Sequence, residues 1–317
     1  MSTAMQSTST LTAPGDTGMT DRPSMVRIWV MAARIRTLPA AVAPVLVGTS
    51  LALGAGVFHP LAFVAALLGA VFIQVGTNLS NDYSDARRGA DTEDRLGPVR
   101  VTAGGLVPPR QVLIATYATF GLAVLCGVYL VAVAGPELIA VGAASILAGV
   151  LYTGGPRPYG YEGLGEVFVF LFFGVVAVTG SYFVQVQELP WQAFGCAVPV
   201  GLLASAILVV NNVRDIDTDR RAGKRTLAVR LGRERTRALY TAMAISAFVS
   251  APVLWALGMS PWLLLSWAAI PLAVGVVRTV RTRVDGPALN GALAKTGMLQ
   301  LLFCLLFAAG ILASGGI

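Results

Sequence analysis

Histidine, cysteine and charged residues are scarce in this chain, and each shortage argues against a class of function. The only histidine, His59, lies in a short connection between two apolar segments, which argues against a histidine metal centre or a Ser-His triad. The three cysteines, Cys126, Cys196 and Cys304, fall inside apolar runs without paired spacing, so neither a disulfide framework nor a zinc site is supported. Any acid–base or metal chemistry therefore depends on other side chains.

Charged residues make up only 12% of the 317 residues and hydrophobic residues 56%, a composition far from that of a soluble domain. Apolar runs of roughly 20 residues, long enough to cross the hydrocarbon core of a bilayer, recur along the chain. They cover residues 37–57, 61–82, 110–134, 137–153, 164–185, 191–212, 234–257, 260–280 and 289–313. We therefore expect an all-α, polytopic membrane protein with nine transmembrane helices.

The first residues lack the basic start and the apolar core of a cleaved signal peptide. They are rich in Ser, Thr and Gly, which predicts a disordered tail over residues 1–25 and a single transmembrane domain over residues 26–317. Trp29 and the arginines around it predict a short helix at the membrane interface before the first span.

The positive charges are distributed asymmetrically. All 23 Lys and Arg residues lie before the first span or in and beside the connections 2–3, 4–5, 6–7 and 8–9. The positive-inside rule then puts the N-terminus and these connections in the cytoplasm and the C-terminus outside a cell membrane. Topology and attraction to anionic lipid account for the net charge of +7, so no nucleic-acid partner is needed.

An acidic segment, "NLSNDYSDARRGAD" (78–91), follows the second span. Residues three and four apart share a helix face, so Asn78, Asp82 and Asp85 form one row of oxygen ligands, with Asn81 beside it. Like-charged carboxylates at the margin of hydrocarbon are costly, so a positive group should lie among them.

A second acidic segment, "NNVRDIDTDRRAGKRT" (211–226), follows the sixth span, and its Asn211, Asp215 and Asp219 are spaced i, i+4, i+8. With an offset of 130, "NDYSD" (81–85) matches "NNVRD" (211–215), and both segments continue into Arg pairs and a glycine. The pattern predicts an internal duplication that presents two acidic helix ends on one side of the membrane.

Two oxygen-ligand clusters facing each other suit Mg²⁺, which keeps coordination positions for water and substrate phosphate. Lys224 and Arg225, directly after the second row, are candidates for neutralising a diphosphate. The plainer alternative is that the aspartates only pair with neighbouring arginines. A metal-bound diphosphate at the end of an apolar bundle suits a polyprenyl diphosphate, because each buried CH₂ contributes about 0.8 kcal/mol and keeps the tail in the bilayer.

The two acidic segments resemble the aspartate-rich signatures of the UbiA superfamily of intramembrane prenyltransferases, and the resemblance covers the chain after about Trp29. It implies an all-helical bundle around a central cavity and Mg²⁺ dependence. It also implies that the catalytic aspartates Asp82, Asp85, Asp215 and Asp219, with Asn78 and Asn211, serve the metal and the diphosphate. Tyr152 and Arg157 fall where the family contacts phosphate.

Four further strings are similar to the branch of the superfamily that prenylates 1,4-dihydroxy-2-naphthoate in menaquinone synthesis. They are "RIRTLPAAVAPVLVGT" (34–49), "VTAGGLVPPR" (101–110), "YTGGPRPYGYEGLGE" (152–166) and "AGKRTLAVRLG" (222–232). This resemblance implies transfer of a polyprenyl group with loss of CO₂, giving demethylmenaquinone. Additional site candidates at the same end of the bundle are Asn81, Asp91, Arg36 and Lys295.

Two alternatives stay open at this stage. One is a different acceptor within the same superfamily, such as 4-hydroxybenzoate, homogentisate or haem. The other is a secondary transporter, which can also be built from repeats with intramembrane acids. Transporters usually hold their polar groups near the midplane, whereas nearly all the acids here lie at the predicted cytoplasmic helix ends.

Overall fold

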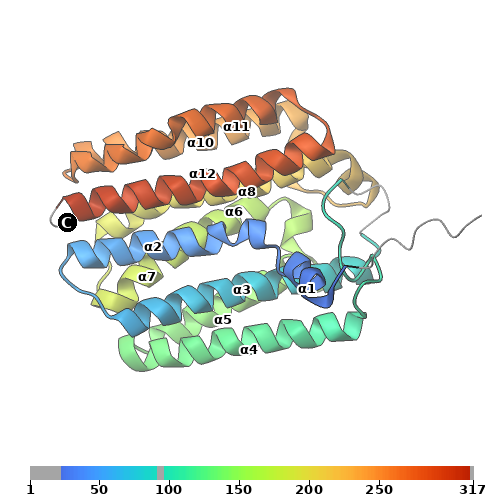
Figure 1. The fold of residues 1–317 in the computed structure, drawn as a ribbon, viewed down its shortest axis with the longest axis horizontal. Helices are drawn as coiled ribbons and strands as arrows, with labels where there is room; N and C mark the ends of the chain where they lie inside the picture. Colours follow the sequence, from blue (N-terminus) through green and yellow to red (C-terminus); the bar gives the residue numbers. More distant parts are fainter. Residues whose placement is uncertain (1–22, 91–95, 315–317) are drawn as a thin grey trace, which may run out of the picture.

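The computed structural model describes residues 23–90 and 96–314, and this part of the chain consists of helices and loops without strands (Figure 1). The expectation of an all-α protein is confirmed. The helices of the first half are α1 (Met25–Ala33), η1 (Ile35–Thr37), α2 (Pro39–Gly54), α3 (Pro60–Arg87), α4 (Pro109–Ala134) and α5 (Glu137–Leu151). Those of the second half are η2 (Tyr159–Glu162), α6 (Gly165–Val169), η3 (Phe170–Val176), α7 (Ala177–Val186), α8 (Trp191–Arg221), α9 (Leu227–Leu231), α10 (Arg233–Ala256), η4 (Pro261–Ala269), α11 (Ile270–Thr282) and α12 (Gly286–Ala313).

Seven helices of the described chain are long and apolar enough to cross a membrane, and an eighth candidate is the pair Met25–Thr37 and Pro39–Gly54, which is bent by 51°. A span need not be one ideal helix: α6, η3 and α7 run continuously from Gly165 to Val186, with a π-helical turn in the middle. The remaining predicted span corresponds to α5, a shorter apolar helix of 15 residues. The protein is thus a multi-pass membrane protein.

The main core lies around α8 and α12, which pack against α2, α7 and α10. Its fully buried side chains are small or aliphatic on α8, such as Ala197 and Val200, and aromatic on α12, where Phe303 stacks on Phe307. Large apolar side chains on the outer helices, including Ile114 and Leu125 of α4, are exposed as expected for a surface that faces lipid.

Close helix contacts depend on small residues. A Cβ at Gly174 of η3 would lie 2.6 Å from the Cα of Gly201 in α8, so the two backbones meet with no room for a side chain. A Cβ at Gly310 of α12 would lie 2.3 Å from the carbonyl oxygen of Trp262. Such small-residue contacts let helices approach closely where lipid provides no hydrophobic driving force.

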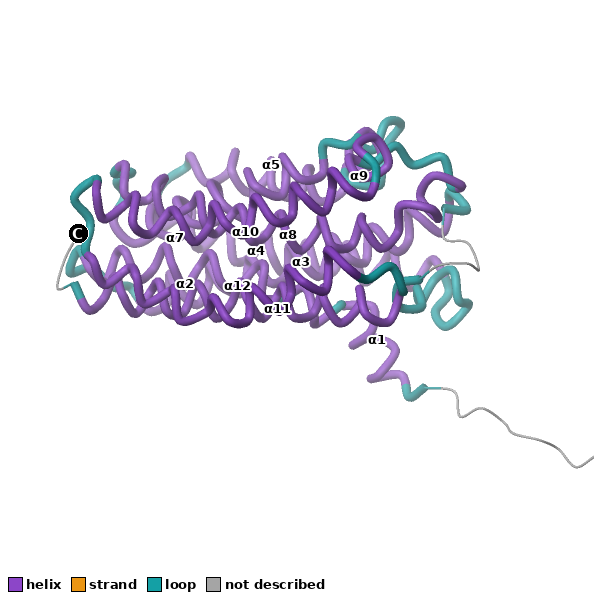
Figure 2. Tube along the Cα trace, turned by 90° about the horizontal axis from the view of Figure 1, so that it is seen from above, coloured by secondary structure: helices purple, strands orange, loops and turns teal. Residues whose placement is uncertain are grey.

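The predicted short N-terminal helix exists as α1, which leaves the bundle at an angle to the long helices (Figure 2). The side chain of Ser24 caps it by accepting a hydrogen bond from the backbone N–H of Arg27 at 3.4 Å. Most of the predicted disordered tail, residues 1–22, lies outside the described residues.

Both acidic segments form the ends of long helices, α3 and α8, and both helices end in the same way. After α3 the amide of Gly89 donates to the carbonyl of Ala86, and that of Ala90 to the carbonyl of Asp85. After α8 the amide of Gly223 donates to Arg220, and that of Lys224 to Asp219. Gly89 and Gly223 have positive φ angles of 64° and 74°, as a Schellman C-cap requires.

The repeated cap relates the two helix ends by an offset of 134 residues, because it pairs Asp85 with Asp219 and Gly89 with Gly223. The match of the sequence strings, by contrast, has an offset of 130 and pairs Asp85 with Asp215. The difference is about one turn of helix. A shift of one turn keeps a residue on the same face of a helix, so the strings alone do not determine the register.

Candidate active site

The carboxylate of Asp82 holds a loop over the end of α3. It accepts hydrogen bonds from the backbone N–H groups of Val101 at 3.1 Å and Thr102 at 2.9 Å. The same loop is closed by the amides of Leu106 and Val107, which donate to the carbonyl of Val101. The "VTAGGL" string is therefore a compact turn fixed to the first acidic row.

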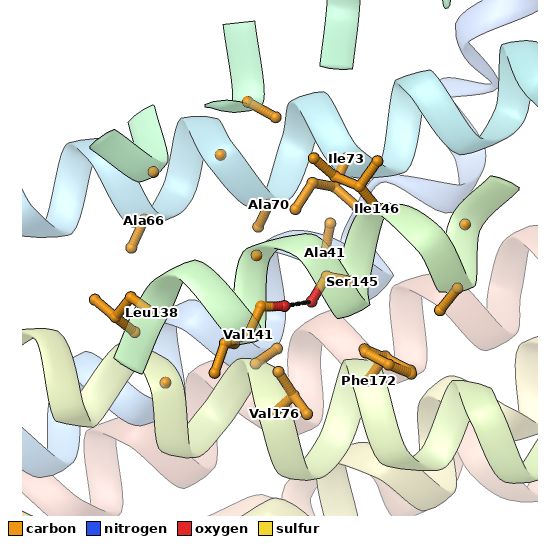
Figure 3. Close-up of a pocket in the computed structure, with 18 of the residues that line it drawn as sticks. Ala41, Ala66, Ala70, Ile73, Leu138, Val141, Ser145, Ile146, Phe172 and Val176 are labelled. Atoms are coloured by element: carbon orange, nitrogen blue, oxygen red, sulfur yellow. Dashed lines mark hydrogen bonds between the residues drawn. The ribbon is translucent and has the colours of Figure 1, made fainter. Parts of the chain in front are cut away.

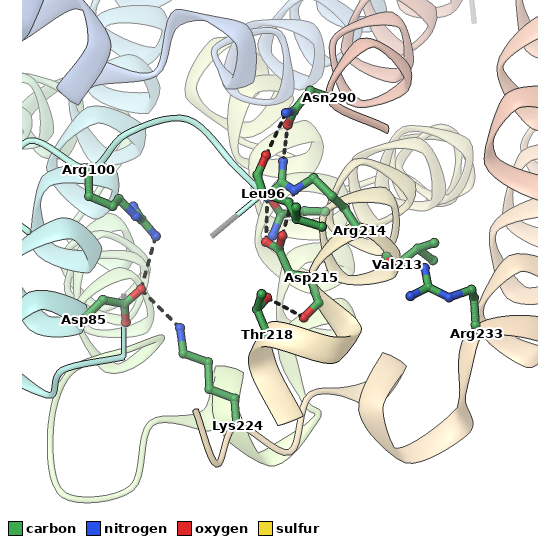
Figure 4. A network of polar contacts seen from close by, with 11 residues as sticks. Asp85, Leu96, Arg100, Val213, Arg214, Asp215, Thr218, Lys224, Arg233 and Asn290 are labelled. Atoms are coloured by element: carbon green, nitrogen blue, oxygen red, sulfur yellow. Dashed lines mark hydrogen bonds and ion pairs between the residues drawn. The ribbon is translucent and has the colours of Figure 1, made fainter. Parts of the chain in front are cut away.

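Asp85 connects three other parts of the chain (Figure 4). Its Oδ2 lies 3.1 Å from the guanidinium of Arg100 and 3.5 Å from Nζ of Lys224, and its Oδ1 accepts from the hydroxyl of Tyr161 at 2.6 Å. Asp85 is 1% exposed, and Arg100 and Lys224 are also buried. Lys224 lies three residues after the end of α8, within the second acidic segment, so this ion pair joins the two acidic helix ends.

The asparagines of the first row contact neighbouring segments. The Asn78 amide donates to the carbonyl of Ala33 at 3.0 Å and to the hydroxyl of Thr37 at 3.2 Å, joining α3 to the bend between α1 and α2. Asn81 accepts from the hydroxyl of Thr153 at 2.9 Å. The first row therefore joins α3 to the segments that surround the site.

The second acidic segment is organised by Arg214, which the residue spacing did not single out. Its guanidinium donates to both oxygens of Asp215 at 2.8 and 2.6 Å, and to Oδ1 of Asn211 at 2.8 Å and Asn290 at 2.6 Å. Arg214 is 2% exposed. Figure 4 shows this group beside the Asp85 group. Asp219, one turn further along α8, is partly exposed and accepts the C-capping hydrogen bond at its carbonyl.

The cations predicted from the carboxylate repulsion are therefore present: Arg100 and Lys224 at Asp85, and Arg214 at Asp215. Among the described residues, no group of three or more His, Cys, Asp or Glu side chains is placed to hold a metal ion. The donor atoms themselves are all carboxylate and amide oxygens, which is the chemistry that a hard divalent cation prefers. The residues fit Mg²⁺ in donor type, with their carboxylates now engaged by protein cations and amides.

The connection 152–166 contacts this group through Thr153 and Tyr161. The ring of Tyr152 packs on Gly160 and Gly165, where an added Cβ would lie 2.8 and 3.3 Å from its Cε2. Burial, and then the negative charges of Glu166, Asp219 and Asp85, raise the pKa of Tyr152 well above its usual value, so its hydroxyl stays neutral.

Other aromatic contacts continue into the bundle. Tyr159 donates to the carbonyl of Ala148 at 2.8 Å and stacks on Phe168 with ring centroids 4.0 Å apart. Burial raises its pKa as well. Lys224 lies over the ring of Tyr161 at 4.8 Å, and Arg88 donates to the carbonyl of Gly155. Aromatic rings thus lead from the ion pairs into the bundle.

The remaining candidate residues lie at the edge of the site. Arg157, Arg225, Arg36 and Lys295 are exposed, and Arg225 contributes its backbone N–H to the carbonyl of Tyr161 at 2.9 Å. Asp91 lies outside the described residues.

Beside this polar group lies an apolar cavity of about 510 Å³ between α2, α3, α4, α5 and the α6–α7 span. Gln74 and Thr77 line it near the acidic end of α3. The labelled residues in Figure 3 are small or aliphatic apart from Ser145 and Phe172. They are Ala41, Ala66, Ala70, Ile73, Leu138, Val141, Ser145, Ile146, Phe172 and Val176. No described lining residue carries a charge, so the cavity suits a hydrocarbon chain.

Site residues that spacing alone did not single out are Arg100, Arg214 and Glu166. Arginines at the predicted cytoplasmic face have a topological explanation, so nothing in their positions distinguished the buried ones. Glu166 is 4% exposed and accepts a hydrogen bond from Asn212 at 2.9 Å, joining α6 to α8. The sequence could have pointed to Glu166, because it is an acidic residue at the start of a predicted transmembrane span.

Comparison with known proteins shows the family of this chain. The model of the UbiA prenyltransferase family matches residues 41–290. The 1,4-dihydroxy-2-naphthoate octaprenyltransferase of Mycobacterium tuberculosis is 45% identical over 290 residues, covering 90% of this chain and 97% of the relative. The Escherichia coli protein of the same name is 39% identical, with coverages of 92% and 97%.

A UbiA homologue from Archaeoglobus fulgidus, solved with DMAPP and Mg²⁺, shares the fold with a TM-score of 0.64 and 15% identity, covering 90% of this chain and 99% of that one. The family match covers most of the transmembrane region, and the relatives align over nearly their whole lengths. These matches exclude the transporter alternative. This chain belongs to the UbiA prenyltransferase family.

Proposed function

We propose that the protein transfers a polyprenyl group from a polyprenyl diphosphate to 1,4-dihydroxy-2-naphthoate. The C–O bond to the diphosphate breaks, a C–C bond forms at the carboxyl-bearing ring carbon, and the carboxylate leaves as CO₂, giving diphosphate and the reduced, hydroquinone form of demethylmenaquinone. One observation carries the proposal: the Lys224–Asp85 pair joins two acidic helix ends beside an apolar cavity. The names of the relatives support the naphthoate as acceptor.

We assign the metal site to Asn78, Asp82, Asp85, Asn211, Asp215 and Asp219. Bound Mg²⁺ would neutralise charge that develops on the departing diphosphate. Lys224, Arg100 and Arg214 pair with these carboxylates in the present structure. Together with Tyr152, Arg157 and Arg225 they would contact the phosphate oxygens of the diphosphate.

The prenyl chain occupies the apolar cavity in this proposal. Tyr159, Phe168 and Phe172 stack in a row and line the cavity, where their ring faces would stabilise the allylic cation left after the C–O bond breaks. The uncharged lining excludes water that would otherwise capture this cation.

We further propose nine spans arising from duplication, with α5 as the shortest. At about 1.5 Å per residue, its 15 residues reach roughly 22 Å, so it would cross only with help from its flanking loops. Exposed tryptophans at the helix ends opposite the acids, Trp191, Trp255, Trp262 and Trp267, support an outer interface there. The N-terminus then lies in the cytoplasm and the C-terminus outside the cell membrane.

The test incubates the purified protein in detergent with a polyprenyl diphosphate and Mg²⁺, offering 1,4-dihydroxy-2-naphthoate and 4-hydroxybenzoate in parallel. We expect a prenylated naphthalene whose mass is lower by CO₂ than that of simple addition, and its loss on adding EDTA. Product from 4-hydroxybenzoate alone would reject the acceptor and keep the prenyl transfer. If neither acceptor gave a product, the naphthoate reaction would be rejected.

A further inference from the structure

Four carboxylates are buried in the described chain: Asp82, Asp85, Glu166 and Asp215. The three aspartates have polar partners at both oxygens, either cations, hydroxyls or backbone amides. Glu166 differs, because its Oε2 is buried and has no hydrogen-bond partner. A buried carboxylate oxygen without a partner costs free energy, so its retention calls for an explanation.

Glu166 is held rigidly by its other polar atoms. Its Oε1 accepts from the Asn212 amide at 2.9 Å, and its backbone carbonyl accepts from the hydroxyl of Ser205 at 3.0 Å. Both partners lie on α8, the helix that ends in the second acidic segment. One carboxylate oxygen is therefore fixed to the scaffold, and the second is left for another group.

The position of Glu166 links the ion pairs to the cavity. It lies in α6 just before Phe168 and Val169, which line the cavity, and just after Gly165, on which the Tyr152 ring packs. Asn212, which holds it, directly follows Asn211 of the second acidic row. Glu166 thus lies between the second acidic segment and the residues that line the cavity.

We propose that Glu166 binds the aromatic acceptor, with Oε2 accepting a hydrogen bond from a ring hydroxyl. The proposal rests on the proposed function. An unpaired carboxylate oxygen repels phosphate, so the diphosphate is not its partner, whereas a phenolic hydroxyl is a neutral donor. A hydrogen bond to a carboxylate also leaves more electron density on the ring that attacks the prenyl cation. Asn212 is the positioning residue for this contact.

The test uses Glu166→Gln with three acceptors: 1,4-dihydroxy-2-naphthoate and its two analogues that each lack one hydroxyl. Gln keeps an oxygen for Asn212 and removes the charge. We expect kcat/KM for the full acceptor to fall about 10- to 100-fold, the range for a hydrogen bond to a charged group. For the analogue without the bound hydroxyl, kcat/KM should match that of the wild type, and KM for polyprenyl diphosphate should be unchanged.

Two further variants separate binding from structure. Glu166→Asp keeps a carboxylate at a shorter reach, so it should retain more activity than Glu166→Gln, whereas a purely structural role would favour the isosteric Gln. Glu162→Gln is the matched control, because Glu162 lies in the same connection, is 53% exposed and pairs with Arg230. It should leave all the kinetic constants unchanged.

Each outcome has a definite meaning. Absence of naphthoate turnover by the wild type overturns the proposed function, and the inference falls with it. If the wild type is active and Glu166→Gln lowers kcat/KM by the same factor for all three acceptors, the hydroxyl contact is overturned and the proposed function stands. A variant that changes only the Mg²⁺ concentration needed for half-maximal rate also overturns the hydroxyl contact, since that result assigns Glu166 to the metal.

Discussion

Asp215→Asn tests the second acidic segment most directly. The two hydrogen-bonded contacts of 2.8 and 2.6 Å between Arg214 and Asp215 are buried, with side-chain exposures of 2% and 8%. Removing one partner of a buried pair leaves an uncompensated charge and costs about 3–5 kcal/mol. Asn211 and Asn290 still bind the guanidinium, so we expect the lower end of this range for the free energy of unfolding. Loss of a proposed metal ligand should reduce turnover by at least about 10- to 100-fold.

The matched control is Asp217→Asn, two residues further along the same helix. Asp217 is 62% exposed and pairs with Arg233 and Arg220 at the surface, where a pair contributes about 0–1 kcal/mol. Unfolding by denaturant in detergent micelles and product formation are measured for both variants. Wild-type turnover in Asp215→Asn, or equal destabilisation by the two substitutions, would refute the role of the buried pair.

Three other changes probe the rest of the site. Lys224→Met removes a cation from Asp85 and from the proposed diphosphate contact, so KM for polyprenyl diphosphate should rise at least about 10-fold in steady-state kinetics. An unchanged KM would contradict this role. Ala70→Phe fills part of the cavity, and we expect the ratio of kcat/KM for long over short prenyl diphosphates to fall; a constant ratio would locate the chain elsewhere. Tyr152→Phe should lower turnover by a similar factor at every pH from 6 to 9, because the raised pKa of Tyr152 keeps its hydroxyl protonated throughout. A new inflection in the pH–rate profile would argue against a neutral hydroxyl.

Much of the fold follows from hydropathy. Runs of about 20 apolar residues must form helices in lipid, since each backbone polar group needs a partner within its own segment. The run 37–57 illustrates what hydropathy misses, because the helix begins at Pro39 after a bend of 51°. The span 164–185 contains a π-helical turn whose Phe172 lines the cavity, and no hydropathy pattern indicates such a turn.

The sequence predicted which polar side chains lie at the two helix ends but not what they contact. Spacing of i, i+4 puts Asp82 and Asn78 on one face of a helix, whatever surrounds them. It does not reveal that Asp82 binds backbone amides while Asp85 binds two cations and a hydroxyl. These differences arise from loops that return to the helix end from distant parts of the chain.

By itself the sequence determined that this protein is helical, lies in the membrane and carries two acidic helix ends, because these properties follow from local composition and helical period. Only the tertiary structure decided which cations neutralise which carboxylates, where the apolar cavity lies, and that Glu166 keeps one unpartnered oxygen. Lys224 and Asp85 are 139 residues apart, and their ion pair forms only when α3 and α8 pack into one bundle. Contacts at such separation depend on the packing of whole helices, which a local pattern does not contain.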